Sequence, residues 1–501
     1  MTQLNRRSFI GLSSKSIAGA LLAPSLGGFL ESCSKSDQLS SFDWQILSNQ
    51  LNGTVLLPGA PGFDPFTLPY ALQYGKTIPQ AVVRCMSEKD VVTTVKWARQ
   101  NGVALTTRSG GHSYAGYSST NELLLDLSGF NNISINSSTG LATLDGGVRN
   151  RHAYAAFRQP SLAITHGRCK NVGVGGLVLG GGIGFNMRAQ GLTCDQLVET
   201  RMVSADGDIV VCSETENPDL FWAIRGAGGG NFGIHTSFTF KPFAVTQVTR
   251  FKIEWANNPQ QVYIALQQVL LNAPKELGVK VSIELVKKRQ RMPDGTAQMV
   301  TVPVVSILGQ FRGDIAAFRA IIAPVNTVAR ATFEDIAVQD YWDAQEFLSE
   351  EGTPEFVHER CRFAFEPLSE AAIAAIFIKL AEWPGTSGTA IFKYFLLGGA
   401  VGNKAPEETA FFARNAKMIT SIELSWKEGD QNLFGNKQWL DEFYLILTAF
   451  TSEYSYVNFI DRNEPKFLDA YYGPALPKLK AIKKLVDPKN HFRFPQGIPV
   501  G

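Results

Sequence analysis

Two nucleophilic side chains stand among unusually small neighbours. His112 lies in RSGGHSYAGYS, a run with almost no aliphatic side chain, and Cys169 lies in GRCKNVGVGG. Imidazole and thiolate are the side chains most ready to add to an electrophilic ligand near neutral pH, and small surroundings let them reach it. These stretches therefore predict a site of covalent chemistry. The alternative is structural, with an inert thiol and a histidine satisfied within its loop.

Glycine is concentrated around these two residues. Three clusters occupy residues 108–116, 173–184 and 225–233. In such loops, backbone N–H groups approach an extended, phosphate-bearing ligand without hindrance from side chains. Tight turns in a crowded sheet would explain any one cluster, but three within about 130 residues favour a binding cradle built from loops.

The third cluster imitates a nucleotide-binding fingerprint. Gly228, Gly230 and Gly233 have the spacing G-x-G-x-x-G. That fingerprint requires a following helix, whose N-terminus meets a pyrophosphate. Residues 234–240 instead alternate apolar and polar side chains, which predicts a strand. The sequence therefore argues against a Rossmann unit here.

The elements around these loops predict an α+β fold. AVVRCMSEKDVVTTVKWARQNGVALTT indicates a strand, an amphipathic helix and a second strand, which ends just before His112. Short strands and turns follow up to about residue 148. Between about residues 245 and 450, apolar strands such as VKVSIELV and VVSILGQF are interleaved with helical stretches such as EAAIAAIFIKLAEW. This pattern predicts an antiparallel sheet covered by helices.

Composition limits the partners. The chain has 501 residues, with Lys+Arg 47 against Asp+Glu 45, and its charges are interspersed. We therefore expect no nucleic acid partner. The six cysteines form no C-x-x-C pair and no H-E-x-x-H motif is present, so no metal site is expected. No disulfide pairing follows from the spacing.

The first 33 residues resemble an export signal rather than part of the fold. Arg6 and Arg7 precede an uncharged stretch that is too short to span a bilayer, a layout typical of a twin-arginine signal. We expect export to the periplasm or cell exterior. Cys33 follows LES and resembles a lipoprotein cleavage box, although Glu31 fits poorly, so a lipid anchor at Cys33 stays an alternative.

Longer motifs carry a family resemblance. RSGGHSYAGYS, GRCKNVGVGGLVLGGGIG, DLFWAIRGAGGGNFGI, SYVNFID and VDPKNHFRFPQGI occur in this order. Together they closely resemble the FAD-linked oxidases of the berberine bridge enzyme-like group, over roughly residues 42–501. The resemblance implies a two-part FAD-binding domain of the vanillyl-alcohol oxidase and p-cresol methylhydroxylase type. Its parts would be residues 42–244 and 450–501, with a substrate domain at 245–449.

The resemblance also implies how the cofactor is held. In this family a histidine bonds the 8α-methyl of FAD and, in some members, a cysteine bonds position 6 of the same ring. The matching residues are His112 and Cys169, so bicovalent FAD is expected. The noncovalent contacts implied by the matching motifs come from Arg108, Ser109, Gly110, Gly111, Ser113, Gly116, Ser118, Gly173, Gly176, Gly180, Gly181, Asn231, Gly233, Ile234, Asn458 and Asn490.

Catalysis by such a protein needs a base for the substrate hydroxyl. Tyr456 in SYVNFID matches an active-site tyrosine of many relatives and is the first candidate, whereas the second aromatic of that motif is Phe459 here. Glu423 in SIELSW is the second candidate. Each has a structural alternative: a core tyrosine, or a strand residue facing solvent.

The resemblance implies an oxidase that transfers hydride from an alcohol group to FAD and passes electrons to dioxygen. A dehydrogenase with another acceptor, an oxidative cyclisation enzyme and a flavin-binding protein without turnover are the alternatives, in falling order. A carbohydrate or another alcohol is the preferred substrate. We expect a monomer without a transmembrane helix.

Overall fold

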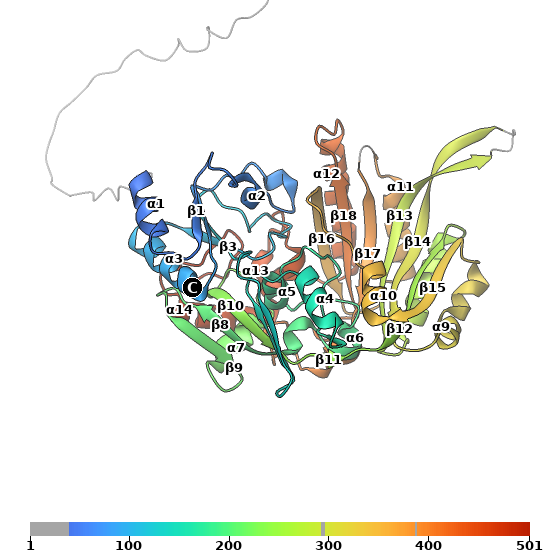
Figure 1. Cartoon of the computed structure of the whole chain (residues 1–501). Helices are drawn as coiled ribbons and strands as arrows, with labels where there is room; N and C mark the ends of the chain where they lie inside the picture. The colour runs from blue at the N-terminus through green and yellow to red at the C-terminus, as the bar shows by residue number, and fades with distance from the viewer. Residues whose placement is uncertain (1–39, 292–295, 386–387) are drawn as a thin grey trace, which may run out of the picture.

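The computed structural model describes residues 40–291, 296–385 and 388–501. The expected export signal, with Arg6, Arg7 and Cys33, lies outside the described residues and stays a prediction. Figure 1 shows a part built from small sheets and short helices beside a part dominated by one large sheet. The site forms where these two parts meet.

The first part opens with a four-stranded sheet. Its elements are α1 (Ser41–Ser48), β1 (Thr54–Leu56), α2 (Asp64–Thr67), η1 (Leu72–Tyr74), β2 (Ala81–Arg84), α3 (Glu88–Gln100), β3 (Leu105–Arg108) and β4 (Leu123–Asp126). The predicted strand, helix and strand are β2, α3 and β3. The side chain of Ser87 caps α3, and Gly102 follows its end with φ +67°. β3 pairs in parallel with β4, and its carboxyl end leads directly into the loop of His112.

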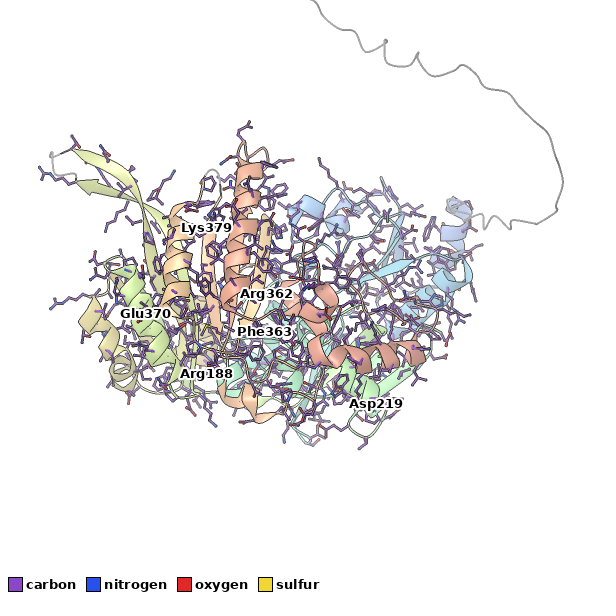
Figure 2. The ribbon with its side chains drawn as sticks, turned by 180° about the vertical axis from the view of Figure 1, so that it is seen from behind. Arg188, Asp219, Arg362, Phe363, Glu370 and Lys379 are labelled. Carbon is purple, nitrogen blue, oxygen red and sulfur yellow. The ribbon has the colours of Figure 1, made fainter. Side chains whose placement is uncertain are left out.

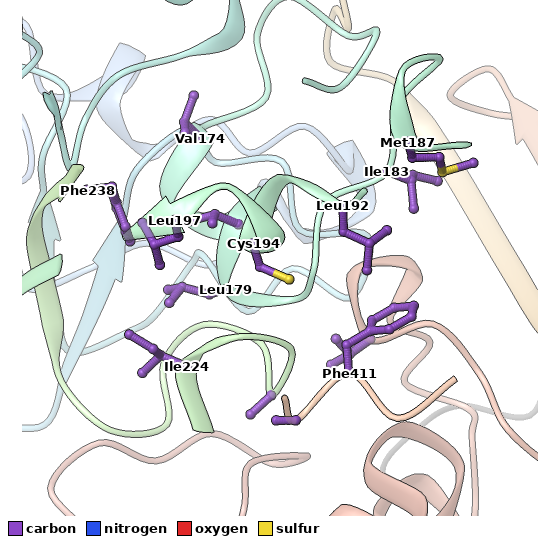
Figure 3. Packing of buried hydrophobic residues seen from close by; sticks show 14 of the residues in the cluster. Val174, Leu179, Ile183, Met187, Leu192, Cys194, Leu197, Ile224, Phe238 and Phe411 are labelled. Atoms are coloured by element: carbon purple, nitrogen blue, oxygen red, sulfur yellow. The ribbon is translucent and has the colours of Figure 1, made fainter. Parts of the chain in front are cut away.

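A five-stranded antiparallel sheet of order β5-β6-β10-β8-β9 follows. The elements of this region are β5 (Ile133–Asn136), β6 (Leu141–Asp145), α4 (Asn150–Arg158), β7 (Leu162–Ala163), α5 (Val174–Leu179), α6 (Met187–Gln190), η2 (Thr193–Asp195), β8 (Leu197–Val203), β9 (Ile209–Ser213), α7 (Pro218–Ile224), β10 (Ile234–Phe240) and β11 (Phe243–Ala244). The third glycine cluster leads into the central strand β10, which confirms the predicted strand. Figure 3 shows part of the buried core that this region contributes, with Val174, Leu179 and Phe238 among its residues.

The second part is a seven-stranded antiparallel sheet of order β15-β12-β14-β13-β17-β18-β16. Its elements are β12 (Gln247–Trp255), α8 (Pro259–Leu271), β13 (Leu277–Arg291), β14 (Ala297–Phe311), α9 (Ile315–Val328), β15 (Phe333–Asp340), α10 (Tyr341–Leu348), β16 (Phe356–Ala364), α11 (Glu370–Ala381), β17 (Ala390–Leu396), η3 (Gly399–Asn403), β18 (Met418–Trp426) and α12 (Leu433–Phe450). One face shares a core with α8, α9, α11 and α12. The predicted antiparallel sheet with covering helices is confirmed, and with it the α+β class.

The last segment returns to the first part. It contains η4 (Val457–Phe459), α13 (Phe467–Tyr472), η5 (Gly473–Ala475) and α14 (Leu476–Val486). The buried ammonium of Lys483 donates to the carbonyl oxygens of Asn231 at 2.7 Å and Phe492 at 2.6 Å. This contact ties the C-terminal segment to the third glycine cluster. The domain boundaries at residues 244 and 450 stay predictions.

Two buried arginines hold the site region together, and both are labelled in Figure 2. Arg188 on α6 donates to the carbonyls of Ala273 at 3.0 Å and Leu397 at 3.0 Å, which joins the first part to the large sheet. Arg362 on β16 donates to Ser455 Oγ at 3.1 Å and pairs with Glu464 at 3.1 Å. It thereby fixes the segment that carries Tyr456, because hydrogen bonds to buried charged groups are costly to lose.

The structure bears on membrane spans and metal sites for the described residues only. No helix among them is long and apolar enough to cross a membrane. No group of three or more His, Cys, Asp and Glu side chains in the same part of the chain is arranged to hold a metal ion.

Candidate active site

A cavity of about 340 Å³ lies between the glycine loops and the large sheet. Most of the predicted site residues line it, although they come from segments far apart in the chain. These residues are Ser109, Gly110, Gly111, His112, Ser113, Ser118, Cys169, Gly173, Gly176, Gly233, Ile234, Glu423, Tyr456 and Asn458. The fold therefore gathers both candidate tether residues and both candidate catalytic residues around one space.

Aromatic packing, rather than a hydrogen bond to Nε2, holds the His112 ring. Its ring stacks on Tyr70 with centroids 3.6 Å apart, and Tyr114 meets it edge-on at 6.0 Å. Burial lowers the pKa of His112 to about 4, so the imidazole is neutral near pH 7. Nε2 is buried and has no hydrogen-bond partner. A neutral imidazole with an unsatisfied nitrogen suits attachment to a ligand.

Cys169 lies at the same end of the cavity. Its thiol donates a hydrogen bond to Glu350 Oε1 at 2.8 Å, and Arg168 forms an ion pair with the other oxygen of that carboxylate. Gly352, with φ +65°, separates the two tether candidates: a Cβ there would be 2.9 Å from His112 Nε2 and 3.2 Å from Cys169 Cβ. The two nucleophiles are thus neighbours across a single glycine.

Some predicted cofactor contacts lie outside the cavity lining. These residues are Arg108, Gly116, Gly180, Gly181, Asn231 and Asn490. Arg108, for example, turns towards neighbouring loops, where Nε donates to the Ser118 carbonyl at 2.8 Å and Nη1 donates to the Phe66 carbonyl. Gly180 faces Asn458, whose Oδ1 would lie 2.1 Å from a Cβ. Their observed contacts shape the loops, and direct cofactor contact stays a prediction.

The hydroxyl of Tyr456 is already engaged. It accepts hydrogen bonds from the Gly182 backbone N–H at 3.0 Å and from Asn458 Nδ2 at 2.9 Å, and the residue is only 1% exposed. Burial raises the pKa of Tyr456 above its ordinary value. Because two donors point at its oxygen in an apolar setting, Tyr456 suits the role of a fixed hydrogen-bond partner.

The large sheet contributes a buried charged group of three side chains. Lys393 on β17 lies 2.7 Å from Glu423 on β18 and 3.2 Å from Glu359 on β16. Burial, together with the neighbouring Glu423, raises the pKa of Glu359 to about 7. Burial also acts to raise the pKa of Glu423, but the charge and hydrogen bond of Lys393, together with Glu359 and Lys280, outweigh it and leave that pKa below its ordinary value. Of the two carboxylates beside Lys393, Glu423 is therefore the ionised one, and it lines the cavity.

Aromatic rings border this charged group. Phe459 packs against Tyr114 at 5.7 Å and against Phe395 at 5.9 Å between ring centroids. All three residues line the cavity. The cavity lining thus combines apolar ring surfaces with the Lys393 ammonium and the carboxylates of Glu423 and Glu350.

Comparisons with known proteins fix the family. The family model described as FAD binding domain matches residues 79–213, and that described as Berberine and berberine like matches residues 455–499. An uncharacterised FAD-linked oxidoreductase of Bacillus subtilis (strain 168) is 34% identical over 432 residues, which are 84% of this chain and 91% of that one. The chain belongs to the berberine bridge enzyme-like FAD-linked oxidoreductases.

Characterised relatives agree with this assignment. A xylooligosaccharide oxidase of Thermothelomyces thermophilus is 28% identical over 84% of this chain and 87% of its own. Among solved structures, the berberine bridge enzyme-like protein 1 of Physcomitrella patens superposes with a TM-score of 0.81 at 28% identity, over 91% of this chain and 99% of that one. This oxidoreductase therefore has the fold and the FAD-binding domain that its motifs predict.

The residues of this oxidoreductase fit a flavin dinucleotide. Gly110 and Gly173 approach so closely that a Cβ on Gly173 would lie 2.4 Å from the Gly110 nitrogen, which keeps this part of the cradle free of side chains. A Cβ on Gly176, by contrast, would meet nothing within 4 Å. His112 Nε2 and Ser118 Oγ are buried polar atoms without partners in residues that line the cavity. An extended ligand with polar atoms suits these features.

Sequence reasoning missed several cavity residues of this oxidoreductase. Glu350, Lys393 and Phe395 line the cavity, and Glu359 lies directly behind Lys393. A signal was present for Lys393, because a charged residue in the apolar strand AIFKYFL is unusual unless it is paired. Glu350 carries no such signal, since it follows α10 in a polar stretch whose place in space depends on the fold.

Proposed function

We propose that this protein is an oxidase that holds FAD through both His112 and Cys169 and oxidises an alcohol group of a small molecule. The observation that carries the proposal is the meeting of these two nucleophiles at one end of the cavity, on either side of Gly352. The 8α-methyl and position 6 belong to the same ring of the flavin, so two adjacent side chains can serve both.

Glu423 is the proposed catalytic base. FAD, when bound, supplies the hydride acceptor for the substrate carbon. The carboxylate of Glu423 accepts the proton of the substrate hydroxyl, because it lines the cavity and is kept ionised by Lys393 at 2.7 Å. Glu359 lies 3.2 Å from the same ammonium, so Lys393 is paired with a carboxylate on each side.

Tyr456 has a positioning role in this proposal. Its oxygen accepts from Gly182 N–H and Asn458, so its single proton is left for a third partner. The raised pKa makes it a poor proton acceptor near neutral pH. It is thus suited to donate a hydrogen bond to the cofactor or substrate.

A carbohydrate is the preferred substrate class. Relatives named as xylooligosaccharide, glucooligosaccharide and chitooligosaccharide oxidases support it. The rings of Tyr114, Phe395 and Phe459 supply flat apolar surfaces for the faces of a sugar, and Lys393 and Glu423 supply polar groups for its hydroxyls. A relative named (R)-6-hydroxynicotine oxidase makes amines the second class to test. We further propose export through the N-terminal signal, with the cofactor acquired before export.

The attachment is tested first. Purified protein is precipitated in acid, and the pellet is examined by intact mass and absorption for the wild type, His112→Ala, Cys169→Ala and the double variant. We expect one FAD mass on the wild type and on each single variant, and none on the double variant. A wild-type chain without added mass would contradict covalent attachment, and loss of FAD from one single variant alone would leave only one tether.

Turnover is tested on the flavin-loaded enzyme. Oxygen consumption and hydrogen peroxide are measured over oligosaccharides, simple alcohols and amines, and the same substrates are offered without oxygen together with an artificial electron acceptor. Peroxide formation with a sugar supports the oxidase. Turnover only with the artificial acceptor would indicate a dehydrogenase instead.

A further inference from the structure

We propose that Glu350 is the general base that takes the thiol proton of Cys169 when the thioether to the flavin forms. This inference rests on the bicovalent attachment proposed above and assigns the residue that makes its cysteine half. Glu350 would then be a catalytic residue of cofactor attachment, whereas Glu423 serves the substrate.

The main chain holds Glu350 against Cys169. The Glu350 N–H donates to the Arg168 carbonyl at 3.1 Å, and the Lys170 N–H donates to the Glu350 carbonyl at 2.8 Å. These two bonds form an isolated parallel bridge between Cys169 and Glu350. Side chains at paired positions point the same way, so the thiol and the carboxylate meet, with Sγ 2.8 Å from Oε1.

The carboxylate is kept in the form that can accept a proton. Burial acts to raise the pKa of Glu350, but the Arg168 guanidinium, the hydrogen bond from the Cys169 thiol and the ammonium groups of Lys280 and Lys393 together outweigh it and leave the pKa lowered. Arg168 engages one oxygen of Glu350, and the thiol engages the other. The oxygen that receives the proton is therefore already hydrogen-bonded to the group that gives it.

Cys169 needs such help. Burial, together with the neighbouring Glu350 charge, raises its pKa well above the ordinary value, so the free thiolate is scarce near pH 7. A thiol in this setting is inert until proton transfer and sulfur attack occur together. The arrangement lets Cys169 react when an electrophilic ring lies beside it.

The same loop also contacts the histidine tether. Gly352 lies between His112 and Cys169. Glu355 accepts a hydrogen bond at 2.7 Å from the hydroxyl of Tyr70, and His112 stacks on the Tyr70 ring. Residues 350–355 are thus anchored at both tether sites. This explains how a residue from the second part of the chain is delivered to a cysteine of the first.

The chemistry balances with dioxygen as the oxidant. Glu350 takes the proton from sulfur as the bond between Sγ and flavin position 6 forms. The hydrogen at position 6 leaves as a proton, and its bonding electrons remain on the ring, so attachment leaves the flavin reduced by two electrons. Dioxygen, the acceptor already proposed for turnover, removes these two electrons with two protons and becomes hydrogen peroxide.

The test isolates the thioether by removing the other tether. In the His112→Ala background, any FAD mass on the chain after acid precipitation must be held by Cys169. Glu350→Gln is added to this background, with Glu351→Gln as the matched control, because Glu351 is the next residue and its ion pairs with Arg151 and Lys170 lie on the exposed surface. We expect Glu350→Gln to slow thioether formation by about 10²-fold or more, with Glu351→Gln unchanged.

The single variant Glu350→Gln supplies the folding control. With His112 present we expect one FAD on the chain through the histidine and a Cys169 thiol free to react with an alkylating reagent. Incubation at raised pH should restore the thioether, because hydroxide replaces the missing base, and a purely structural role would not give that recovery. Equal thioether yields in Glu350→Gln and the wild type would overturn the inference, as would loss of both tethers in Glu350→Gln and Glu350→Asp alike. A wild-type chain without covalent FAD would instead contradict the proposed function itself.

Discussion

The two walls of the cavity are built on different principles. The wall formed by the glycine loops presents backbone and small side chains, as where Gly110 and Gly173 approach each other. The wall formed by the large sheet presents ionised groups and rings, among them Lys393, Glu423 and Phe395. The first wall suits holding a large cofactor, and the second suits moving a proton on a variable substrate. Attachment and turnover should therefore be separable by substitution.

The largest expected effect of breaking this division comes from Glu423→Gln. Because the amide cannot accept the substrate proton, we expect kcat to fall by about 10² to 10⁴-fold while covalent FAD content stays at the wild-type level. Turnover is measured by peroxide formation and FAD content by absorption of the denatured chain. A fall of less than tenfold, with a large fall in Tyr456→Phe, would move the base to Tyr456.

Lys393→Met tests the role of Glu423 through the pH dependence of activity. Activity needs ionised Glu423, so it is lost as pH falls through the pKa of that group, and Lys393 holds this pKa down. Without the ammonium the acidic limb of the activity profile should move to higher pH by about one to three units. Lys393→Arg keeps the charge and is the control. An unmoved limb in Lys393→Met would contradict the electrostatic role.

Tyr456→Phe should cost stability more than chemistry. The change leaves the Gly182 N–H and the Asn458 amide without their acceptor, which we expect to lower the free energy of unfolding by about 1–3 kcal/mol. Turnover should fall by no more than about tenfold. Denaturant unfolding and steady-state rates are compared with Tyr454→Phe, which lies on the same segment but outside the cavity lining. An unchanged free energy of unfolding in Tyr456→Phe would contradict the role of Tyr456 as a fixed hydrogen-bond partner.

The smallest effect is expected from Gly176→Ala, a substitution in the wall formed by the glycine loops. Gly176 lies in α5, and a Cβ there meets nothing within 4 Å, so Gly176→Ala should leave the fold intact or stabilise it by up to about 1 kcal/mol. The added methyl group enters the space assigned to the cofactor and should lower the fraction of chains that carry FAD. Full FAD loading would show that the cofactor lies elsewhere along this wall.

The difference between the walls also explains what the sequence could predict. His112 and Cys169 lie in continuous runs of small residues, so their stretches were recognisable without any fold. The strands β10, β13 and β14 were predicted from alternation, which an element shows when one of its faces is more buried than the other. The charged group of Glu359, Lys393 and Glu423 was not predicted beyond Glu423, because its members meet only after three strands pair. Glu350 depends on a bridge between segments about 180 residues apart, for which local pattern contains no signal.

The central claim is that one flavin is bonded to both His112 and Cys169. The most direct measurement is proteolysis of the denatured wild-type protein followed by mass spectrometry of the yellow fraction. The account predicts a single species in which the peptide containing His112, the peptide containing Cys169 and one FAD are joined. Two unmodified peptides, or FAD on one of them alone, would contradict it.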